Sequence, residues 1–329
     1  MFDHGTGTDK DARRVFQLSD ISANPVEEVS GRAISAADLR PLLQRDDRQA
    51  LRQLAGHLLL LALTGTLIAQ AQGSPWLWPA MFLHGAILVF LFAPLHETIH
   101  RTAFATRALN DGAAFVIGLL LMLPREYFRA FHFAHHRHTQ DPARDPEISS
   151  PRPVTRGEWL IYVSGLPYWR GQLAGLVTRA FGRVAEDFYG NDIQRQKVVR
   201  ESRIVLGIYA ILLIGSLAFE SDLLLRYWVI PALLGQPLLR LYLLAEHWGC
   251  PLSPAAAPID MLARSRTTYT NALVNFLAWN MPYHAEHHAN PAVPFHALPR
   301  ANALLKDRLG TTSPGYVAAT RWIYERLHA

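Results

Sequence analysis

Histidine occurs in this chain at a spacing that suits metal binding. The pattern His-x-x-His-His is found twice, first at His132, His135 and His136 and again at His284, His287 and His288. On a helix, positions i, i+3 and i+4 share one face, so each triplet directs three imidazoles toward one place. Imidazole is a ligand for iron, zinc and copper. Each triplet is therefore a candidate group of metal ligands.

Two further positions extend this candidate set. His96 and His100 stand four residues apart at the end of an apolar run, and His247 closes another apolar run. One metal ion takes roughly four to six ligands, so the pair and the two triplets offer more than one ion can use. The sequence therefore predicts two metal ions close together, with His247 as a ninth ligand. We expect no site role for His4, His57, His84 and His328, while His138 and His296 either support the site or lie at the surface.

Long apolar runs divide the chain between membrane and water. A helix needs about 20 apolar residues to cross roughly 30 Å of hydrocarbon. Four runs approach that length, at residues 54–71, 76–95, 204–219 and 223–245. A fifth run at 113–123 is too short and ends at Pro124. We therefore predict an all-α membrane protein with four transmembrane helices.

The distribution of charge predicts how these spans are oriented. Residues 72–75 and 220–222 contain no lysine or arginine, whereas residues 101–203 and 250–329 are rich in arginine. Because cytoplasmic loops carry the excess of basic residues, we expect two membrane hairpins with both termini in the cytoplasm. The pair and both triplets of histidines then lie on the cytoplasmic side, in a helical cap that holds the two metals.

The same patterns predict three regions along the chain. Residues 1–53 form a cytosolic tail, disordered over 1–30 and amphipathic and helical over 35–50, with Ser35 as the N-cap. Residues 54–305 form the membrane domain, whose cytosolic cap comprises 96–203 and 246–305. A helical tail follows at 306–329. Shorter helices are expected near 159–175, 300–309 and 316–328.

Composition argues against several other classes of protein. The single cysteine, Cys250, excludes an internal disulfide framework, a fused rubredoxin and an iron–sulfur centre within this chain. The balance of 32 basic to 27 acidic residues is only mildly cationic. A nucleic-acid-binding protein usually carries a basic stripe without long apolar spans. With 50% hydrophobic residues, the chain fits a protein shared between membrane and water instead.

Two further kinds of metal protein also fit part of the pattern. Residues 96–100 read His-Glu-x-x-His, the zinc metallopeptidase signature in which the glutamate is the general base. An intramembrane zinc protease would need only one further ligand and would leave both triplets unused. A metal transporter would place ionisable residues along its spans, whereas here they gather at one interface. Both the protease and the transporter rank below a two-metal enzyme.

The histidine groups and their surroundings resemble those of the membrane fatty acid desaturase and hydroxylase family. That family carries three boxes, HxxxH, HxxHH and HxxHH, which here read HETIH, HFAHH and HAEHH. Thr139 and residues 145–147 after the second box, and residues 280–283 and 294–299 around the third, are also similar. The resemblance extends over residues 76–305. It is specific for the superfamily and says little about the substrate.

The resemblance implies a diiron enzyme that uses O2 to abstract hydrogen from an acyl or alkyl chain. Fatty acid desaturation in lipid metabolism is the expected reaction, with hydroxylation or decarboxylation to a terminal alkene as alternatives on the same scaffold. Family members recruit a ninth histidine near the fourth span, which corresponds to His247; the asparagine that some members carry four residues earlier is Leu243 here. Electrons must come from a separate ferredoxin, rubredoxin or cytochrome with its reductase. We expect the protein in a bacterial inner membrane.

Each ligating imidazole needs a partner for its other ring nitrogen. Nearby carboxylates and one amide are the residues that we nominate for this role: Glu97, Asp141, Asp145, Glu246, Asn280 and Glu286. They are expected to orient the rings rather than to transfer protons.

Overall fold

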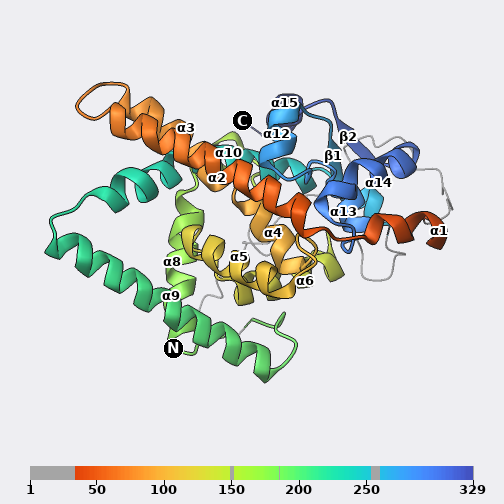
Figure 1. The fold of residues 1–329 in the computed structure, drawn as a ribbon. Coiled ribbons are helices and arrows are strands. Elements are labelled where there is room, and N and C mark those ends of the chain that lie inside the picture. Colours follow the sequence, from red (N-terminus) through yellow and green to blue (C-terminus); the bar gives the residue numbers. More distant parts are fainter. Residues whose placement is uncertain (1–33, 149–151, 185, 253–259, 329) are drawn as a thin grey trace, which may run out of the picture. The chain divides into compact units, whose positions relative to one another are not determined.

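Helices make up most of the computed structural model, which describes residues 34–148, 152–184, 186–252 and 260–328 (Figure 1). Within these residues the strands are limited to β1, Arg266–Thr268, and β2, Thr311–Ser313, which pair in parallel. The predominance of helix agrees with the predicted class. The segment predicted to be disordered, 1–30, and His4 lie outside the described residues.

Among the described residues, four helices are long and apolar enough to cross a membrane. They are α2, Asp47–Gln70; α3 with α4, Leu77–His100; α9, Asp192–Ala218; and η3 with α10, Leu225–His247. Each contains most of one of the four predicted apolar runs. Leucine and isoleucine side chains on α2 and α9, such as Leu59 and Ile211, are exposed on the protein surface. An apolar surface of this kind is what contact with lipid requires.

Two of these helices begin well before their apolar runs. The side chain of Asp46 accepts a hydrogen bond from the backbone N–H of Arg48 and caps α2, and Asn191 caps α9 in the same way through Gln194. Asparagine and aspartate at these positions satisfy backbone donors that the first helical turn leaves free. The apolar run therefore marks the lipid-facing part of each helix, and the capping residue marks where the helix starts.

The predicted amphipathic helix over residues 35–50 is not a single helix. Ser35 caps α1, Ala36–Leu39, as predicted, with Oγ accepting from the backbone N–H of Asp38 at 3.1 Å. A tighter 3₁₀ turn, η2, follows over Arg40–Leu43, and the helix then ends. Pro41 lies in this turn and lacks the N–H that a continuous α-helix would use.

The short run before Pro124 lies on a helix that turns sharply into the next one. Helix α5 spans Arg107–Leu120, and helix α6, Arg125–His138, leaves it at an angle of 99°. Met122 between them has a φ of 53°, in the left-handed region, and Pro124 precedes the first turn of α6. This bend directs α6, which carries the first histidine triplet, toward α4.

Two glycines allow the closest approach between helices. Helix α3, Leu77–Val89, packs against α10, Ile230–His247, at Gly85 and Gly235. A Cβ atom on Gly85 would overlap the carbonyl oxygen of Pro231, and one on Gly235 would overlap that of Gly85. The contact is therefore backbone against backbone. It fixes α10 beside the helix pair α3–α4, whose second member, Phe92–His100, carries the histidine pair.

The remaining helices are short. They are α7, Arg156–Val163; α8, Leu166–Ala180; α11, Met261–Arg264; α12, Ala272–Leu277; α13, His284–Ala289; η4, Phe295–Ala297; α14, Leu298–Leu305; η5, Lys306–Arg308; and α15, Tyr316–Tyr324. The short helices predicted near 159–175 correspond to α7 and α8, which are separated at Gly165, where φ is 72°. Helices α14 and α15 cover most of the two helices predicted near the C-terminus.

Candidate metal centre

The structure brings the nine predicted ligands together from four helices. Helix α4 carries His96 and His100, α6 carries His132, His135 and His136, α10 ends at His247, and α13 carries His284, His287 and His288. All are buried except His100, which is half-buried. On α6 and α13 the spacing i, i+3, i+4 places each triplet on one face, and the two faces meet.

The ring nitrogens converge in two groups. The first group consists of His96, His100, His132, His136 and His287, and the second of His135, His247 and His288. Within each group all ligand nitrogens lie within 4.8 Å of one another. Nε2 of His284 lies 2.9 Å from Nε2 of His247, which places this ring beside the second group.

Hydrogen bonding cannot account for the contacts within the first group. Nε2 of His132 lies 2.5 Å from Nε2 of His96 and 2.9 Å from Nε2 of His136, which in turn lies 3.1 Å from Nε2 of His287. A ring nitrogen has one in-plane site, either an N–H or a lone pair, so it cannot bond two nitrogens in different directions. Metal–imidazole bonds are roughly 2.1 Å long, which places two ligand nitrogens at a right angle about 3 Å apart. A shared cation therefore fits these four atoms.

The second group shows the same pattern. Nε2 of His247 lies between Nε2 of His135, at 3.2 Å, and Nε2 of His284, at 2.9 Å. Nε2 of His100 in the first group and Nε2 of His288 in the second are buried without a hydrogen-bond partner. A buried polar atom without a partner costs roughly 1–3 kcal/mol, a penalty that a metal–nitrogen bond would remove. Both groups thus fit a metal ion.

The protonation state of most of the rings also suits a cation; the exception is His135, whose pKa the carboxylates of Glu147 and Asp145 raise despite its burial. Burial lowers the pKa of His284, His287 and His288 well below the usual value, and neighbouring histidines lower it further. These imidazoles are therefore neutral at neutral pH, with one nitrogen lone pair free to bind a metal.

Two of the six nominated carboxylates and amides contact a ligand ring. Oδ1 of Asp145 lies 2.9 Å from Nδ1 of His135, and Oε1 of Glu246 lies 3.4 Å from Nδ1 of His284. In both cases the carboxylate meets the nitrogen that faces away from the convergence point. Only the contact with Asp145 is a hydrogen bond, and such a bond orients an imidazole and makes it a stronger metal ligand; Nδ1 of His284 has no hydrogen-bond partner.

The other four nominated residues bond elsewhere. Glu97 accepts from Thr102 and from the backbone N–H of Phe295; Asp141 accepts from Arg144 and Ala143; Asn280 donates to the carbonyl of Phe295; and Glu286 accepts from Thr267 and Asn302. For Glu97 and Glu286 the reason is helical geometry. At about 100° per residue, Glu286 lies on the side of α13 opposite its three histidines, and Glu97 lies to one side of the face that His96 and His100 share.

Several partners of the ligand rings could not be read from the sequence. Oγ1 of Thr139 lies 3.2 Å from Nδ1 of His288, and the carbonyl oxygen of Arg264 lies 3.1 Å from Nδ1 of His247. Glu147 adds a carboxylate oxygen 3.6 Å from Nδ1 of His135. A backbone carbonyl carries no residue-type signal at all. For Thr139 and Glu147, the sequence offered their positions shortly after the first triplet and their similarity to the family pattern, but no sign of which ring each would contact.

Two histidines that were expected to have no site role, His57 and His84, lie on the helices α2 and α3. Both rings bond to groups outside the metal centre. Nε2 of His57 lies 2.9 Å from the carbonyl oxygen of Ile87. The ring of His84 contacts Oγ1 of Thr64 at 2.8 Å and the carbonyl oxygen of Tyr227 at 3.1 Å. Both rings link helices at points away from the two histidine groups.

We expect Asp145→Asn to lower metal affinity ten- to 100-fold, as changes in such outer partners roughly do. The amide keeps the size of the carboxylate but loses the charge that strengthens His135 as a ligand. Competition with a chelator, followed by metal analysis, measures the affinity. Asp192→Asn, at an exposed ion pair with Arg195, is the matched control. Equal affinities for wild type and Asp145→Asn would remove this role from the carboxylate.

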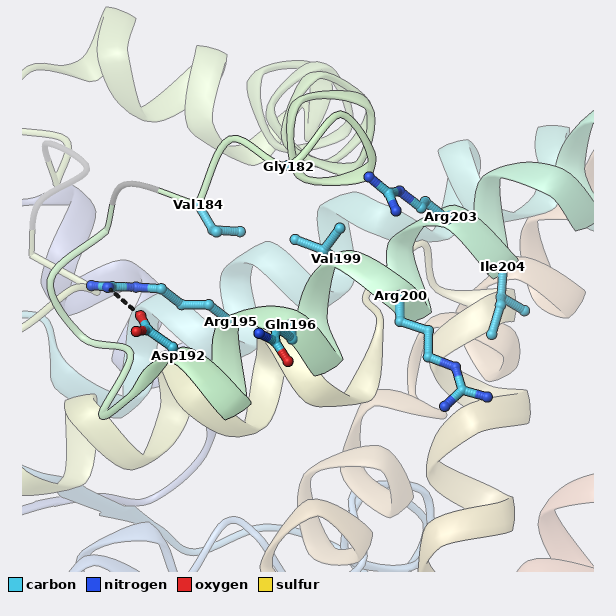
Figure 2. A pocket seen from close by; sticks show the side chains of 9 residues that line it. All are labelled: Gly182, Val184, Asp192, Arg195, Gln196, Val199, Arg200, Arg203 and Ile204. Carbon is cyan, nitrogen blue, oxygen red and sulfur yellow. Dashed lines mark hydrogen bonds and ion pairs between the residues drawn. The ribbon is translucent and has the colours of Figure 1, made fainter.

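A hollow of about 900 Å³ between the end of α8 and the start of α9 is separate from the histidine groups (Figure 2). Its described lining residues are Gly182, Val184, Asp192, Arg195, Gln196, Val199, Arg200, Arg203 and Ile204. Arg195 pairs with Asp192 at 3.3 Å, and Arg203 donates to the carbonyl of Ala180. Three guanidinium groups against one carboxylate suit an anionic group rather than a metal cation.

Comparison with known proteins agrees with this geometry. The family model described as fatty acid desaturase matches residues 31–320. The chain is 23% identical over 278 residues to sphingolipid delta(4)-desaturase DES1 of Drosophila melanogaster, covering 82% of this chain and 79% of that protein. It is 25% identical over 273 residues to sphingolipid delta(4)-desaturase/C4-monooxygenase DES2 of Mus musculus, covering 78% and 74%.

A bacterial relative is similar at the same level. The sn-1 oleoyl-lipid 12-desaturase of Synechocystis sp. is 23% identical over 255 residues, covering 71% of this chain and 68% of that protein. The region matched by the family model contains the three histidine boxes and the four apolar helices. The chain therefore belongs to the fatty acid desaturase family and is an oxidoreductase.

Proposed function

We propose that this protein is an O2-dependent diiron enzyme that desaturates an acyl or alkyl chain at the membrane. The observation that carries the proposal is the convergence of nine histidines in two groups in a chain of the desaturase family. Names of relatives that include sphingolipid and oleoyl-lipid support a lipid substrate. The exposed apolar side chains of α2 and α9 support access from the bilayer.

The two groups of rings are the proposed iron ligands. His96, His100, His132, His136 and His287 hold one ion, and His135, His247, His288 and His284 hold the other. Neutral imidazole suits ferrous iron. When bound, the irons supply the activation of O2 and the oxidising power that removes hydrogen from an unactivated C–H bond.

The protein contributes ligand placement and a dry environment. The ring of Phe92 stacks on His96 at 6.1 Å between centroids, and the rings of Phe128 and Phe133 lie 5.4 and 5.1 Å from those of His132 and His100. These apolar side chains keep water from the rings and strengthen electrostatic interactions in the site. The carboxylate of Asp145 lies behind the ring of His135 and would offset part of the charge of a cation held by the second group.

The electron donor and the orientation of the protein in the membrane are further parts of the proposal. We place the metal centre and both termini on the cytoplasmic side of a bacterial inner membrane, with the spans in two hairpins, because arginine is abundant in 101–203 and 250–329 and lacking in 72–75 and 220–222. A separate ferredoxin, rubredoxin or cytochrome, with its reductase, supplies the electrons. A single cysteine is too few to hold an internal iron–sulfur carrier.

Oxygen insertion is the second candidate reaction. A relative whose name includes both desaturase and C4-monooxygenase favours hydroxylation over decarboxylation. The zinc protease hypothesis loses support, because the carboxylate of Glu97 bonds Thr102 and the backbone of Phe295 while His96 and His100 belong to a group of five histidines.

Mass spectrometry of the product tests the proposal. We expect the purified protein, given O2, a ferredoxin reducing system and acyl substrates of varied length and headgroup, to give a product lighter by two hydrogens. A gain of one oxygen would identify hydroxylation, and loss of carbon dioxide would identify decarboxylation. The same reaction without reductant is the control. Unchanged substrates across all lengths and headgroups, with iron present in the protein, would reject the proposal.

A further inference from the structure

Gln140, two residues after helix α6, adopts an unusual conformation in a fully buried position. Its φ is 64°, in the left-handed region, and its side chain is 0% exposed. Glycine, asparagine and aspartate are the residues that usually accept this conformation. Strained residues persist where their surroundings hold them, and they cluster at functional sites. We therefore asked which contacts hold Gln140 in this conformation.

The backbone N–H, the side-chain N–H and the side-chain oxygen of Gln140 each form a hydrogen bond, with three different residues. Its backbone N–H donates to Oδ2 of Asp145 at 2.8 Å, and its side-chain Nε2 donates to the carbonyl oxygen of His247 at 2.7 Å. Its Oε1 accepts from Nη1 of Arg152 at 2.7 Å. Because arginine only donates, this bond fixes which end of the amide faces His247.

These contacts close a ring around the second group of histidines. Oδ1 of Asp145 meets Nδ1 of His135 at 2.9 Å, and Nε2 of His135 lies 3.2 Å from Nε2 of His247. The path from His135 through Asp145 and Gln140 to His247 thus returns to His135. The two histidines are 112 positions apart and lie on different helices, α6 and α10. Gln140 thus joins them away from the ring nitrogens that face each other, and Arg152, which bonds Gln140, also donates to the carbonyl of His247 at 3.3 Å.

We propose that Gln140 is a positioning residue that sets the separation of His135 and His247 and thereby the affinity of the second group for its metal. Arg152 holds the Gln140 amide in the required orientation. This inference rests on the proposed metal centre. The left-handed backbone conformation of Gln140 has a role in this arrangement, because it lets the N–H reach Asp145 while the side chain reaches His247.

The chemistry of the side chain explains why glutamine is required. Glutamate has the same size and can still bond Arg152, but it would present an oxygen to the carbonyl oxygen of His247. Asparagine accepts the left-handed conformation more readily, but it is one methylene shorter. Glycine relieves the backbone entirely, keeps the N–H to Asp145 and deletes the amide.

Gln140→Gly removes the positioning side chain and relieves the backbone. We expect a lower thermal unfolding temperature, because loss of the buried hydrogen bonds to Arg152 and His247 outweighs the backbone relief, together with a roughly ten- to 100-fold lower affinity for the second iron. Chelator competition and metal analysis measure affinity, and Mössbauer spectra of the iron-loaded protein should show one of two iron environments depleted. Gln140→Glu should show the same loss, which preserves the test if the glycine variant does not fold.

Glu220→Gly is the matched control. Glu220 also has a positive φ, of 48°, but it is exposed and lies after α9. This variant should keep wild-type iron affinity at both positions. Wild-type affinity and spectra in Gln140→Gly and Gln140→Glu would overturn the inference while leaving the diiron proposal intact. Failure of the wild-type protein itself to bind two irons would overturn the proposed metal centre, and the inference with it.

Discussion

His287→Ala and His135→Ala are each expected to abolish turnover, through loss of metal from different groups of ligands. His287 belongs to the first group, where its Nε2 lies 3.1 Å from Nε2 of His136. His135 belongs to the second, where its Nε2 lies 3.2 Å from Nε2 of His247. Removal of a ligand should lower metal affinity by more than about 100-fold, because changes to outer partners alone cost roughly ten- to 100-fold.

The two variants distinguish a two-metal centre from a single site. Each should lose close to one of the two irons and retain most of the other, and neither should produce desaturated product. Metal analysis and the product assay are read together. His138→Ala, at the end of α6 beside the second box, should keep both irons and full activity. If His287→Ala or His135→Ala also kept them, the ligand assignment would be wrong.

The convergence of the histidines could be predicted from sequence because residues three and four positions apart on a helix share a face. Spacing of three and four residues is a property of the chain itself, and the structure places both triplets on helices. The partners of the rings follow a different rule. Asp145 reaches His135 through a turn, and Gln140 reaches His247 from a left-handed backbone. Neither contact could be predicted from the spacing of residues in the sequence. Glu97 and Glu286 are close to ligands in sequence, but their positions on α4 and α13 lie off the faces that carry the histidines.

For the long helices, too, one property could be predicted from the sequence and another could not. Four apolar runs predicted four long helices, because a span must be apolar along its length. Their ends could not be predicted from hydropathy, since α9 begins at Asp192 through its cap at Asn191, twelve residues before the predicted run at 204. Polar residues continue a helix as readily as apolar ones where it leaves the lipid. Helix start signals were present at Asp46 and Asn191, but they are short and common in loops as well.

Gly85→Val is expected to unfold the protein or to cost it several kcal/mol of stability, on the order of the largest single-residue effects. A Cβ on Gly85 would overlap the carbonyl oxygen of Pro231. The obstacle is backbone of α10, which cannot rotate aside as a flexible side chain would. The helices would have to separate, and buried apolar contacts between α3 and α10 would be lost.

The same displacement should reach the metal centre. Helix α10 ends at His247, and the helix pair that contains Gly85 ends at His100, so separation at the glycine contact would move ligands of both groups apart. Gly85→Ala tests this with the smallest possible addition and should lower both the thermal unfolding temperature in lipid nanodiscs and the iron content. Gly207→Ala in α9 is the control, because a Cβ there meets nothing within 4 Å, and alanine should leave stability equal or slightly higher. A Gly85→Ala protein as stable and as rich in iron as Gly207→Ala would show that the close helix contact does not hold the two halves of the centre in place.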